Sequence, residues 1–193
     1  LGADALYYVR QADGRKAIYR QALGTGLSQA VTTEPPPSGG VGYGGALYAV
    51  RDNVLIYAGR DGRLHGLNLT TGEQWAVTPT YEGVAGPAFS PDGRFVAFLA
   101  EQDGRCNVLL VDVRGATLPV KLSDNPWYAF NPTFAPDGLR LAWMEWDEFA
   151  MPWDESRVVV AQFAQPVRAW GLPAVAANPL PLMMWTLAQP GYA

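Results

Sequence analysis

The chain of 193 residues contains one cysteine, one histidine and few charged side chains. With Cys106 alone, no intrachain disulfide is possible and no redox compartment is indicated. One cysteine and one histidine also cannot supply the usual zinc ligand sets, so we expect neither a metal site nor a cofactor. Charged residues make up 17% of the chain and the net charge is −4, with no basic run. This composition disfavours nucleic acid as a partner.

The sequence also lacks a long apolar stretch and a leader. No uninterrupted apolar run reaches the about 18 residues that indicate a membrane helix, so we expect no membrane partner. The chain starts at Leu1 and has no basic segment followed by an apolar one. We therefore expect no signal peptide and a cytoplasmic protein. A start other than methionine indicates a segment of a longer gene product, or a processed one.

The residues of a serine hydrolase site are missing as well. Acyl transfer needs a serine on a Gly-x-Ser-x-Gly elbow together with a histidine and an aspartate. None of the five serines lies in that motif; they are Ser28, Ser38, Ser90, Ser123 and Ser156. The single His65 follows an Asp61-Gly62 turn on a predicted strand, and we interpret it as structural. We therefore predict no catalytic residue in this chain.

What the sequence has is an internal repeat rich in turn residues. Residues 86–98 read Gly-Pro-Ala-Phe-Ser-Pro-Asp-Gly-Arg-Phe-Val-Ala-Phe, and a similar string recurs 45 positions later at 131–143. A fainter Asp-Gly-Arg occurs at Asp13 and again 48 positions later at Asp61. A period of about 40–45 residues filled with short strands is typical of one four-stranded propeller blade.

The repeated turn has a physical basis. In Ser90-Pro91-Asp92-Gly93, proline restricts φ at the first turn position and glycine accepts the left-handed conformation that closes the hairpin. The strands near the turns, at 95–100, 108–111, 139–146 and 158–161, are apolar at nearly every position. Such a pattern predicts strands that are covered on both faces, as between neighbouring blades.

We predict an all-β fold and a single domain over 1–193. It is a β-propeller of four-stranded antiparallel blades, with about four blades present and the ring partial or truncated. No segment shows a helical period with caps. Blade one is expected to lack its first strand, and a tail is expected to begin a further blade. The predicted blades are 1–35, 41–80, 84–123 and 128–170, and the tail is 171–193.

One acidic and aromatic segment is a candidate site. Five carboxylates fall within 11 residues, interleaved with aromatic and methionine side chains. Carboxylates hold the ammonium of a peptide and aromatic walls contact its side chains; the alternative is a solvated loop whose aromatics pack on the blade. No lysine or arginine lies between these carboxylates in the sequence, and the next one is Arg157. We therefore expect the negative charge of the carboxylates not to be cancelled within the loop. The substrate-contact candidates are Glu145, Asp147, Glu148, Trp153 and Asp154.

Of the tryptophans, Trp143 and Trp75 are expected in the core, and Trp127, Trp146 and Trp153 on a concave surface.

The string from Pro132 to Asp154, which ends Met-Pro-Trp-Asp, resembles the propeller domain of bacterial prolyl-oligopeptidase-family serine peptidases. Within that family it is most similar to acylaminoacyl peptidases and dipeptidyl aminopeptidases. Residues 41–50 resemble the family's glycine-tyrosine strand, without the His-Glu that usually precedes the tyrosine, and 184–193 resemble the start of a later blade. Two departures stand out. About 30 residues separate Asp154 from Trp185 where the family has a whole blade, and the α/β-hydrolase domain is absent.

The resemblance implies a non-catalytic propeller that covers a hydrolase domain, in cis or on another chain, and admits only short peptides. The parent protein is then a serine peptidase, while this chain lacks a triad. The alternative is a stand-alone propeller similar to the TolB type, acting as a protein-interaction module. An incomplete ring leaves blade faces unpaired, which favours a homo-oligomer. A small propeller enzyme such as a lactonase ranks last, because its metal needs carboxylates that converge in the channel.

Overall fold

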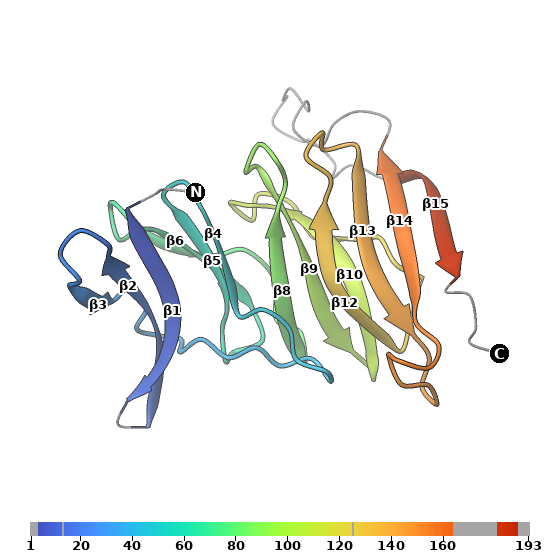
Figure 1. Ribbon diagram of the computed structural model, residues 1–193, viewed down its shortest axis with the longest axis horizontal. Helices are drawn as coiled ribbons and strands as arrows, with labels where there is room; N and C mark the ends of the chain where they lie inside the picture. The colour runs from blue at the N-terminus through green and yellow to red at the C-terminus, as the bar shows by residue number, and fades with distance from the viewer. Residues whose placement is uncertain (1–3, 13, 125, 164–180, 189–193) are drawn as a thin grey trace.

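The computed structural model describes residues 4–12, 14–124, 126–163 and 181–188. These ranges form fifteen β-strands in four antiparallel sheets and contain no helix. Figure 1 shows the sheets standing side by side along an arc, from the blue N-terminal sheet to the orange and red C-terminal one. The all-β prediction is confirmed, and we call the sheets blades one to four in chain order.

Within each blade the strands pair in chain order as an antiparallel meander. Blade one holds β1 (Ala5–Ala12), β2 (Arg15–Ala22) and β3 (Ser28–Ala30). Blade two holds β4 (Tyr48–Arg51), β5 (Val54–Ala58), β6 (Leu64–Asn68) and β7 (Gln74–Ala76). Blade three holds β8 (Gly83–Phe89), β9 (Phe95–Gln102), β10 (Arg105–Asp112) and β11 (Val120–Lys121). Blade four holds β12 (Tyr128–Phe134), β13 (Arg140–Trp146), β14 (Arg157–Phe163) and β15 (Pro181–Ala188).

The Pro-Asp-Gly turns close the hairpins as the sequence predicts. Between β8 and β9, the Gly93 N–H donates to the Ser90 carbonyl over 2.9 Å, and Gly93 has a φ of 75°. The Ser90 hydroxyl donates to Asp92 Oδ1 over 2.7 Å and accepts from the Phe95 N–H over 3.0 Å. The turn thus makes hydrogen bonds within itself. The Pro91 carbonyl also accepts from Arg51 of blade two, and Asp92 Oδ2 is buried without a partner among the described residues.

A repeated hydrogen bond identifies which strand blade one lacks. In three blades, a backbone N–H of one strand donates to a hydroxyl just beyond the outermost strand. The pairs are Ile18 with Thr32 (2.9 Å), Leu64 with Thr78 (3.0 Å) and Val108 with Ser123 (2.9 Å). The donors lie on β2, β6 and β10, so these strands are equivalent. Among the described residues, blade one therefore has no strand in the place of β4, β8 and β12, as the sequence predicts.

Blades two and three are covered on both faces, whereas blade four is covered on one. In β9, every residue from Phe95 to Ala100 is buried. In β13 burial alternates along the strand. Leu141 and Trp143 are buried, whereas Ala142 and Met144 are half-buried. The prediction that 139–146 and 158–161 are covered on both faces is wrong. No sheet in the described part of the chain packs on the outer face of blade four.

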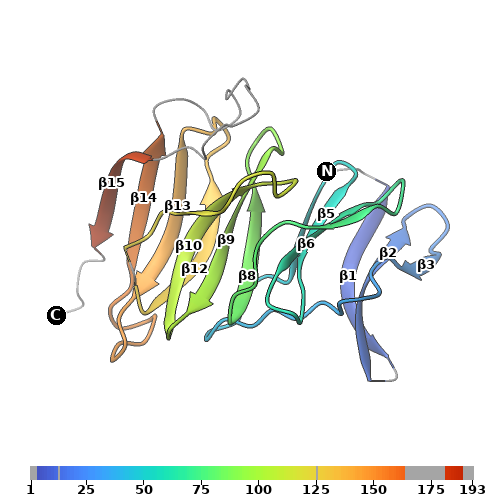
Figure 2. The ribbon, with the colours of Figure 1, turned by 180° about the vertical axis from the view of Figure 1, so that it is seen from behind.

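The arc formed by the described strands is open. Figures 1 and 2 show blade one and blade four at opposite ends of the row from the front and from behind. In blade one only Ile18 of β1 and β2 is buried, on the side that packs against Leu55 and Tyr57 of blade two. Each terminal blade therefore presents one face without a neighbouring sheet among the described residues.

Blade four differs from the prediction in its last strand. β15 pairs antiparallel with β14, from Arg157 opposite Ala188 to Gln162 opposite Met183. Residues 181–188 therefore complete blade four, and the prediction that the segment from 171 onward begins a further blade is wrong for them. The 45-residue period does not predict this strand because the stretch before it is longer than in the other blades. Residues 164–180 and 189–193 lie outside the described residues.

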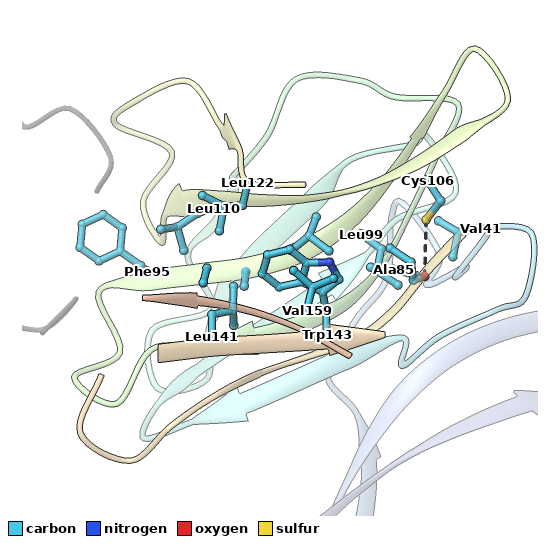
Figure 3. Close-up of a cluster of buried hydrophobic side chains, with 14 of the residues drawn as sticks. Val41, Ala85, Phe95, Leu99, Cys106, Leu110, Leu122, Leu141, Trp143 and Val159 are labelled. Carbon is cyan, nitrogen blue, oxygen red and sulfur yellow. Dashed lines mark hydrogen bonds between the residues drawn. The ribbon is translucent and has the colours of Figure 1, made fainter. Parts of the chain in front are cut away.

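The largest core lies between blades three and four (Figure 3). It joins Leu99 and Leu110 of blade three to Leu141 and Trp143 of blade four, each at most 1% exposed. Cys106 lies in the same cluster, with Sγ 3.7 Å from the Ala129 carbonyl. Burial raises the pKa of the Cys106 thiol to about 11. Cys106 thus packs as a small apolar residue, as the sequence predicts.

Candidate functional site

The longest described loop that joins two strands of one blade lies at the lower end of Figure 1, where β13 ends and β12 begins. It runs from 147 to 156, between β13 and β14. The turn 41–45, which precedes blade two, reaches the same end and contacts blade four. We call this end the mouth; its central residues are Gly42, Tyr43, Glu101, Tyr128, Trp146 and the loop 147–156.

Glu145 is buried and engaged in the sheet. It is 5% exposed, and the Trp143 indole N–H donates to its Oε1 over 2.7 Å. Arg157 lies opposite Glu145 in the ladder, and its Nε donates to Oε2 over 3.2 Å. The same guanidinium donates through Nη1 to Asp147 over 3.4 Å. The prediction that no cation cancels these charges is wrong, because antiparallel pairing brings Arg157 to residues 10 and 12 positions earlier.

The other candidates lie on the exposed part of the loop. Glu148 and Asp154 are exposed, and Trp153 is 75% exposed. The Asp154 N–H donates to the Met151 carbonyl over 2.9 Å, so the loop has a turn of its own. Phe149 is 98% exposed, so the alternative in which the loop aromatics pack on the blade is wrong for Phe149 and Trp153. Substrate contact at Glu148, Trp153 and Asp154 stays a prediction.

The tryptophans divide differently from the prediction at one position. Trp143 and Trp146 are each 1% exposed, so Trp146 belongs to the buried set and not to an open concave surface. Trp75 and Trp127 are half-buried, and each has an arginine over its ring, Arg114 at 4.1 Å and Arg105 at 3.6 Å. Of the three tryptophans expected on a concave surface, only Trp153 is largely exposed.

An aromatic cluster covers Trp146. The Tyr43 ring meets the rings of Tyr128 and Trp146 edge-on, with centroids 4.8 and 5.0 Å apart, and Tyr128 stacks on Trp146 at 5.4 Å. The Tyr43 hydroxyl donates to Met151 Sδ over 3.3 Å, which joins the turn 41–45 to the loop 147–156. Tyr43 is 43% exposed, so the cluster has an open side.

Glycines allow Tyr43 to reach this position. The Gly44 N–H donates to the Val41 carbonyl over 2.6 Å, and Gly44 and Gly45 have φ of 84° and 139°. A Cβ on Gly45 would lie 2.9 Å from the Cβ of Ala85. Sequence reasoning did not select Tyr43; the Gly-Tyr-Gly-Gly string was the available signal, because glycines on both sides mark a constrained backbone.

Glu101 is a second residue that sequence reasoning missed. It lies near the end of β9 and is half-buried. Its Oε1 lies 4.0 Å from the position that a Cβ on Gly42 would occupy, and the Tyr128 ring lies 3.3 Å from the same position. No residue of the described ranges makes a hydrogen bond or ion pair with this carboxylate. In the sequence Glu101 is a single acid at a strand end, which carries no motif.

His65 is a buried partner of Asp61. It is 7% exposed, and its Nε2 lies 3.0 Å from both Asp61 carboxylate oxygens. The Tyr57 ring stacks on the imidazole at 5.4 Å. Burial, with Asp61 and Glu34 nearby, raises the pKa of Tyr57 to about 12. The structural interpretation of His65 is consistent with this packing.

Two further observations concern the described residues as a set. They contain no group of three or more His, Cys, Asp or Glu side chains placed to hold a metal ion. Among them there is also no helix with the length and apolar character to cross a membrane.

The four stacked meanders define a β-propeller segment. No protein-family model matches the chain, and no curated protein matches it in sequence. Among solved structures, a Mycobacterium tuberculosis puromycin-hydrolyzing peptidase matches with a TM-score of 0.76 and 20% identity, over 96% of this chain and 31% of that one. A puromycin hydrolase matches with a TM-score of 0.73 and 21% identity, over 98% of this chain and 32% of that one.

The chain also matches TolB from Acinetobacter baumannii, with a TM-score of 0.63 and 17% identity, over 83% of this chain and 38% of that one. This chain spans about a third of the length of the peptidases it matches. At these identities the likeness shows the fold. The predicted resemblance to the propeller of a prolyl-oligopeptidase-family peptidase is confirmed as a likeness of fold.

Proposed function

We propose that these residues form the non-catalytic propeller portion of a prolyl-oligopeptidase-like serine peptidase of the acylaminoacyl or dipeptidyl peptidase kind. The propeller admits short peptides to an α/β-hydrolase domain, in cis or on another chain, in a cytoplasmic protein. One observation carries the proposal: 96–98% of the chain superposes on part of two puromycin-hydrolysing peptidases. The lack of a Gly-x-Ser-x-Gly elbow agrees with a portion that is not itself catalytic.

The mouth supplies a physical means of selection. The Tyr43–Met151 contact joins the turn 41–45 to the loop 147–156 at the end of blade four. The exposed Glu148 and Asp154 carry negative charge at its edge. A single-signed rim raises the local concentration of cationic ligands and speeds their association. Peptides with a free amine are thus favoured over blocked ones, and narrow peptides over folded chains.

The intact gene product tests this proposal. We expect its measured mass and sequence to include a hydrolase domain with the serine elbow, and the product to cleave di- and tripeptide substrates. Replacing residues 148–154 by a short Gly-Ser linker should increase cleavage of long peptides and leave dipeptide cleavage unchanged. A native product that ends near Ala193, and that co-purifies with no hydrolase chain, would overturn the proposal.

A stand-alone module of the TolB type is the second candidate. Its support is the TolB likeness together with the outer faces of blades one and four, on which no described sheet packs. Such faces favour self-association when nothing else covers them. Light scattering after size exclusion separates the two candidates. A native product without a hydrolase domain that forms a defined oligomer fits the module, whereas a monomeric product with that domain fits the peptidase.

A further inference from the structure

One methionine joins two segments of the mouth through its sulfur. The Tyr43 hydroxyl donates to Met151 Sδ over 3.3 Å, between residues 108 positions apart in the sequence. Met151 is 43% exposed, so its side chain meets solvent as well as Tyr43. A thioether is a weak hydrogen-bond acceptor, and an exposed one is open to oxidation. The contact therefore combines a structural role with a reactive group.

This contact lies at the edge of the aromatic cluster that covers Trp146. The Tyr43 ring meets the Trp146 ring edge-on at 5.0 Å, and Trp146 is 1% exposed. The Trp146 indole N–H is buried without a hydrogen-bond partner among the described residues. Buried polar groups in native proteins nearly always have a partner, and water would supply one here if Tyr43 moved. Displacement of Tyr43 therefore exposes a donor that water can satisfy, which lowers the cost of the movement.

The backbone of Met151 is held in place, so a change at its sulfur acts on the side chains. The Met151 carbonyl accepts from the N–H groups of Asp154 and Glu155, over 2.9 and 3.3 Å. At the base of the same loop, Arg157 binds Asp147 over 3.4 Å. The loop thus keeps Met151 at the contact, and Tyr43 is the partner that has to give way.

We propose that Met151 is a methionine oxidation site and that its sulfoxide displaces Tyr43 from Trp146. The oxidant is a hydroperoxide, of which hydrogen peroxide is the simplest. A sulfur lone pair attacks one peroxide oxygen, the O–O bond breaks and an S–O bond forms. The thioether loses two electrons, and the second peroxide oxygen leaves as water with the proton of the transferred hydroxyl. Methionine sulfoxide reductases reverse the change, with one enzyme for each sulfoxide epimer.

The sulfoxide does not fit the contact as it stands. The new oxygen occupies either of two sulfur lone pairs, which gives the two epimers. In one epimer the oxygen enters the 3.3 Å gap between Sδ and the Tyr43 hydroxyl, so the two side chains must separate. In the other, the oxygen points away and makes a flexible apolar side chain polar, which favours its solvation over packing. Both epimers loosen Tyr43, and the first does so more strongly.

The test treats the whole chain with hydrogen peroxide and follows two readouts. Peptide mass mapping should show Met151 oxidised ahead of Met144, which is half-buried on β13. Acrylamide quenching of tryptophan fluorescence should rise to the level of unoxidised Tyr43→Ala, because both changes uncover Trp146. Treatment with the reductases for both epimers should restore the starting value. The proposal is wrong if Met144 oxidises first, if quenching stays unchanged once Met151 is oxidised, or if reduction does not reverse the rise.

Matched variants assign the effect to one sulfur. Met151→Leu keeps an apolar side chain of similar size without a sulfur, so peroxide should leave its quenching unchanged. Met144→Leu is the control and should respond to peroxide as the parent does. Tyr43→Phe keeps the ring but leaves room beside the sulfur, so its response should be smaller than that of the parent. A rise that persists in Met151→Leu, or one that disappears in Met144→Leu, contradicts the proposal. A common urea unfolding midpoint before oxidation shows that the leucine variants are folded.

This proposal and the proposed function fail separately. Oxidation of Met151 and the exposure of Trp146 are measured on this chain alone and need no hydrolase domain. A gene product without a hydrolase domain would refute the peptidase and leave the oxidation site standing. Conversely, a Met151 whose oxidation moves nothing would leave the peptidase assignment untouched.

Discussion

Arg157 lies directly opposite Glu145 in the β13–β14 ladder, and its Nε donates to the buried Glu145 Oε2 over 3.2 Å. The Glu145 side chain is 7% exposed and the Arg157 side chain 36%. The pair closes the base of the loop 147–156, because Arg157 also holds Asp147. Two of the five predicted contact residues, Glu145 and Asp147, are therefore paired with Arg157 at the base of the loop.

Removing the cation of this pair should destabilise the protein. Arg157→Met leaves the buried Glu145 carboxylate with only the Trp143 indole as a donor. We expect the free energy of unfolding, measured in urea, to fall by roughly 1–3 kcal/mol. Arg140→Met is the control, because its pair with Asp137 is exposed on both sides and such pairs contribute at most about 1 kcal/mol. Equal losses of unfolding free energy in the two variants would show that the buried Glu145–Arg157 pair contributes no more to stability than the exposed pair.

Tyr43 should protect Trp146 from solvent. Tyr43→Ala removes two edge-on ring contacts and the hydroxyl bond to Met151. We expect the free energy of unfolding to fall by roughly 1–3 kcal/mol, since each aromatic pair contributes about 0.5–1.5 kcal/mol. Acrylamide should quench tryptophan fluorescence more strongly in this variant. Tyr43→Phe keeps the ring contacts, so acrylamide should quench its fluorescence nearly as in the parent. If its fluorescence is quenched as strongly as in the alanine variant, the hydroxyl and not the ring protects Trp146.

Gly45 should be intolerant of a side chain. Its φ of 139° disfavours any other residue, and a Cβ would lie 2.9 Å from that of Ala85. Gly45→Ala should cost roughly 1–3 kcal/mol, as expected for a strained backbone position. Gly24→Ala, where nothing lies within 4 Å of the Cβ position, is the matched control. Thermal unfolding compares them, and similar midpoints for both variants would contradict the expectation.

The stability of the chain should fall in alkaline solution partly through Cys106. Burial raises the pKa of its thiol from 9.0 to about 11 in the folded chain. The unfolded chain therefore loses this proton first, so stability is intact below pH 9 and is lost as the pH rises toward 11. Each pH unit in this window costs up to about 1.4 kcal/mol. Cys106→Ala should show a shallower decline between pH 9 and 11; an identical pH profile would refute the role of the thiol.

The exposed acids Glu148 and Asp154 on the loop 147–156 should attract cationic peptides by long-range steering. In the intact peptidase, the double change Glu148→Gln with Asp154→Asn should raise KM for free-amine peptides by roughly two- to tenfold at low salt. High salt should remove this effect, because exposed charges are screened. Peptides with a blocked amine should be unaffected throughout. A salt-independent rise in KM would indicate direct contact by these two loop residues instead.

Local chemistry determined much of the fold. The Pro-Asp-Gly turns at 91–93 and 136–138 predict hairpins because their φ preferences and hydrogen bonds lie within four residues. Their 45-residue spacing predicts the blades, and the apolar strand at 95–100 predicts burial on both faces. Thr32, Thr78 and Ser123 follow one another at intervals of 46 and 45 residues, but isolated hydroxyl residues are too common to be recognised as a repeat.

The tertiary structure decided what lies between the blades. Whether an apolar strand is covered on both faces depends on its neighbours, and the outer face of blade four packs against no described sheet. Arg157 meets Glu145 only through the ladder, and Tyr43 meets Met151 only because the arc brings residues 108 positions apart to one mouth. Such contacts depend on strand register and on the angle between blades. Neither is written in a local pattern, because both arise from the packing of whole sheets.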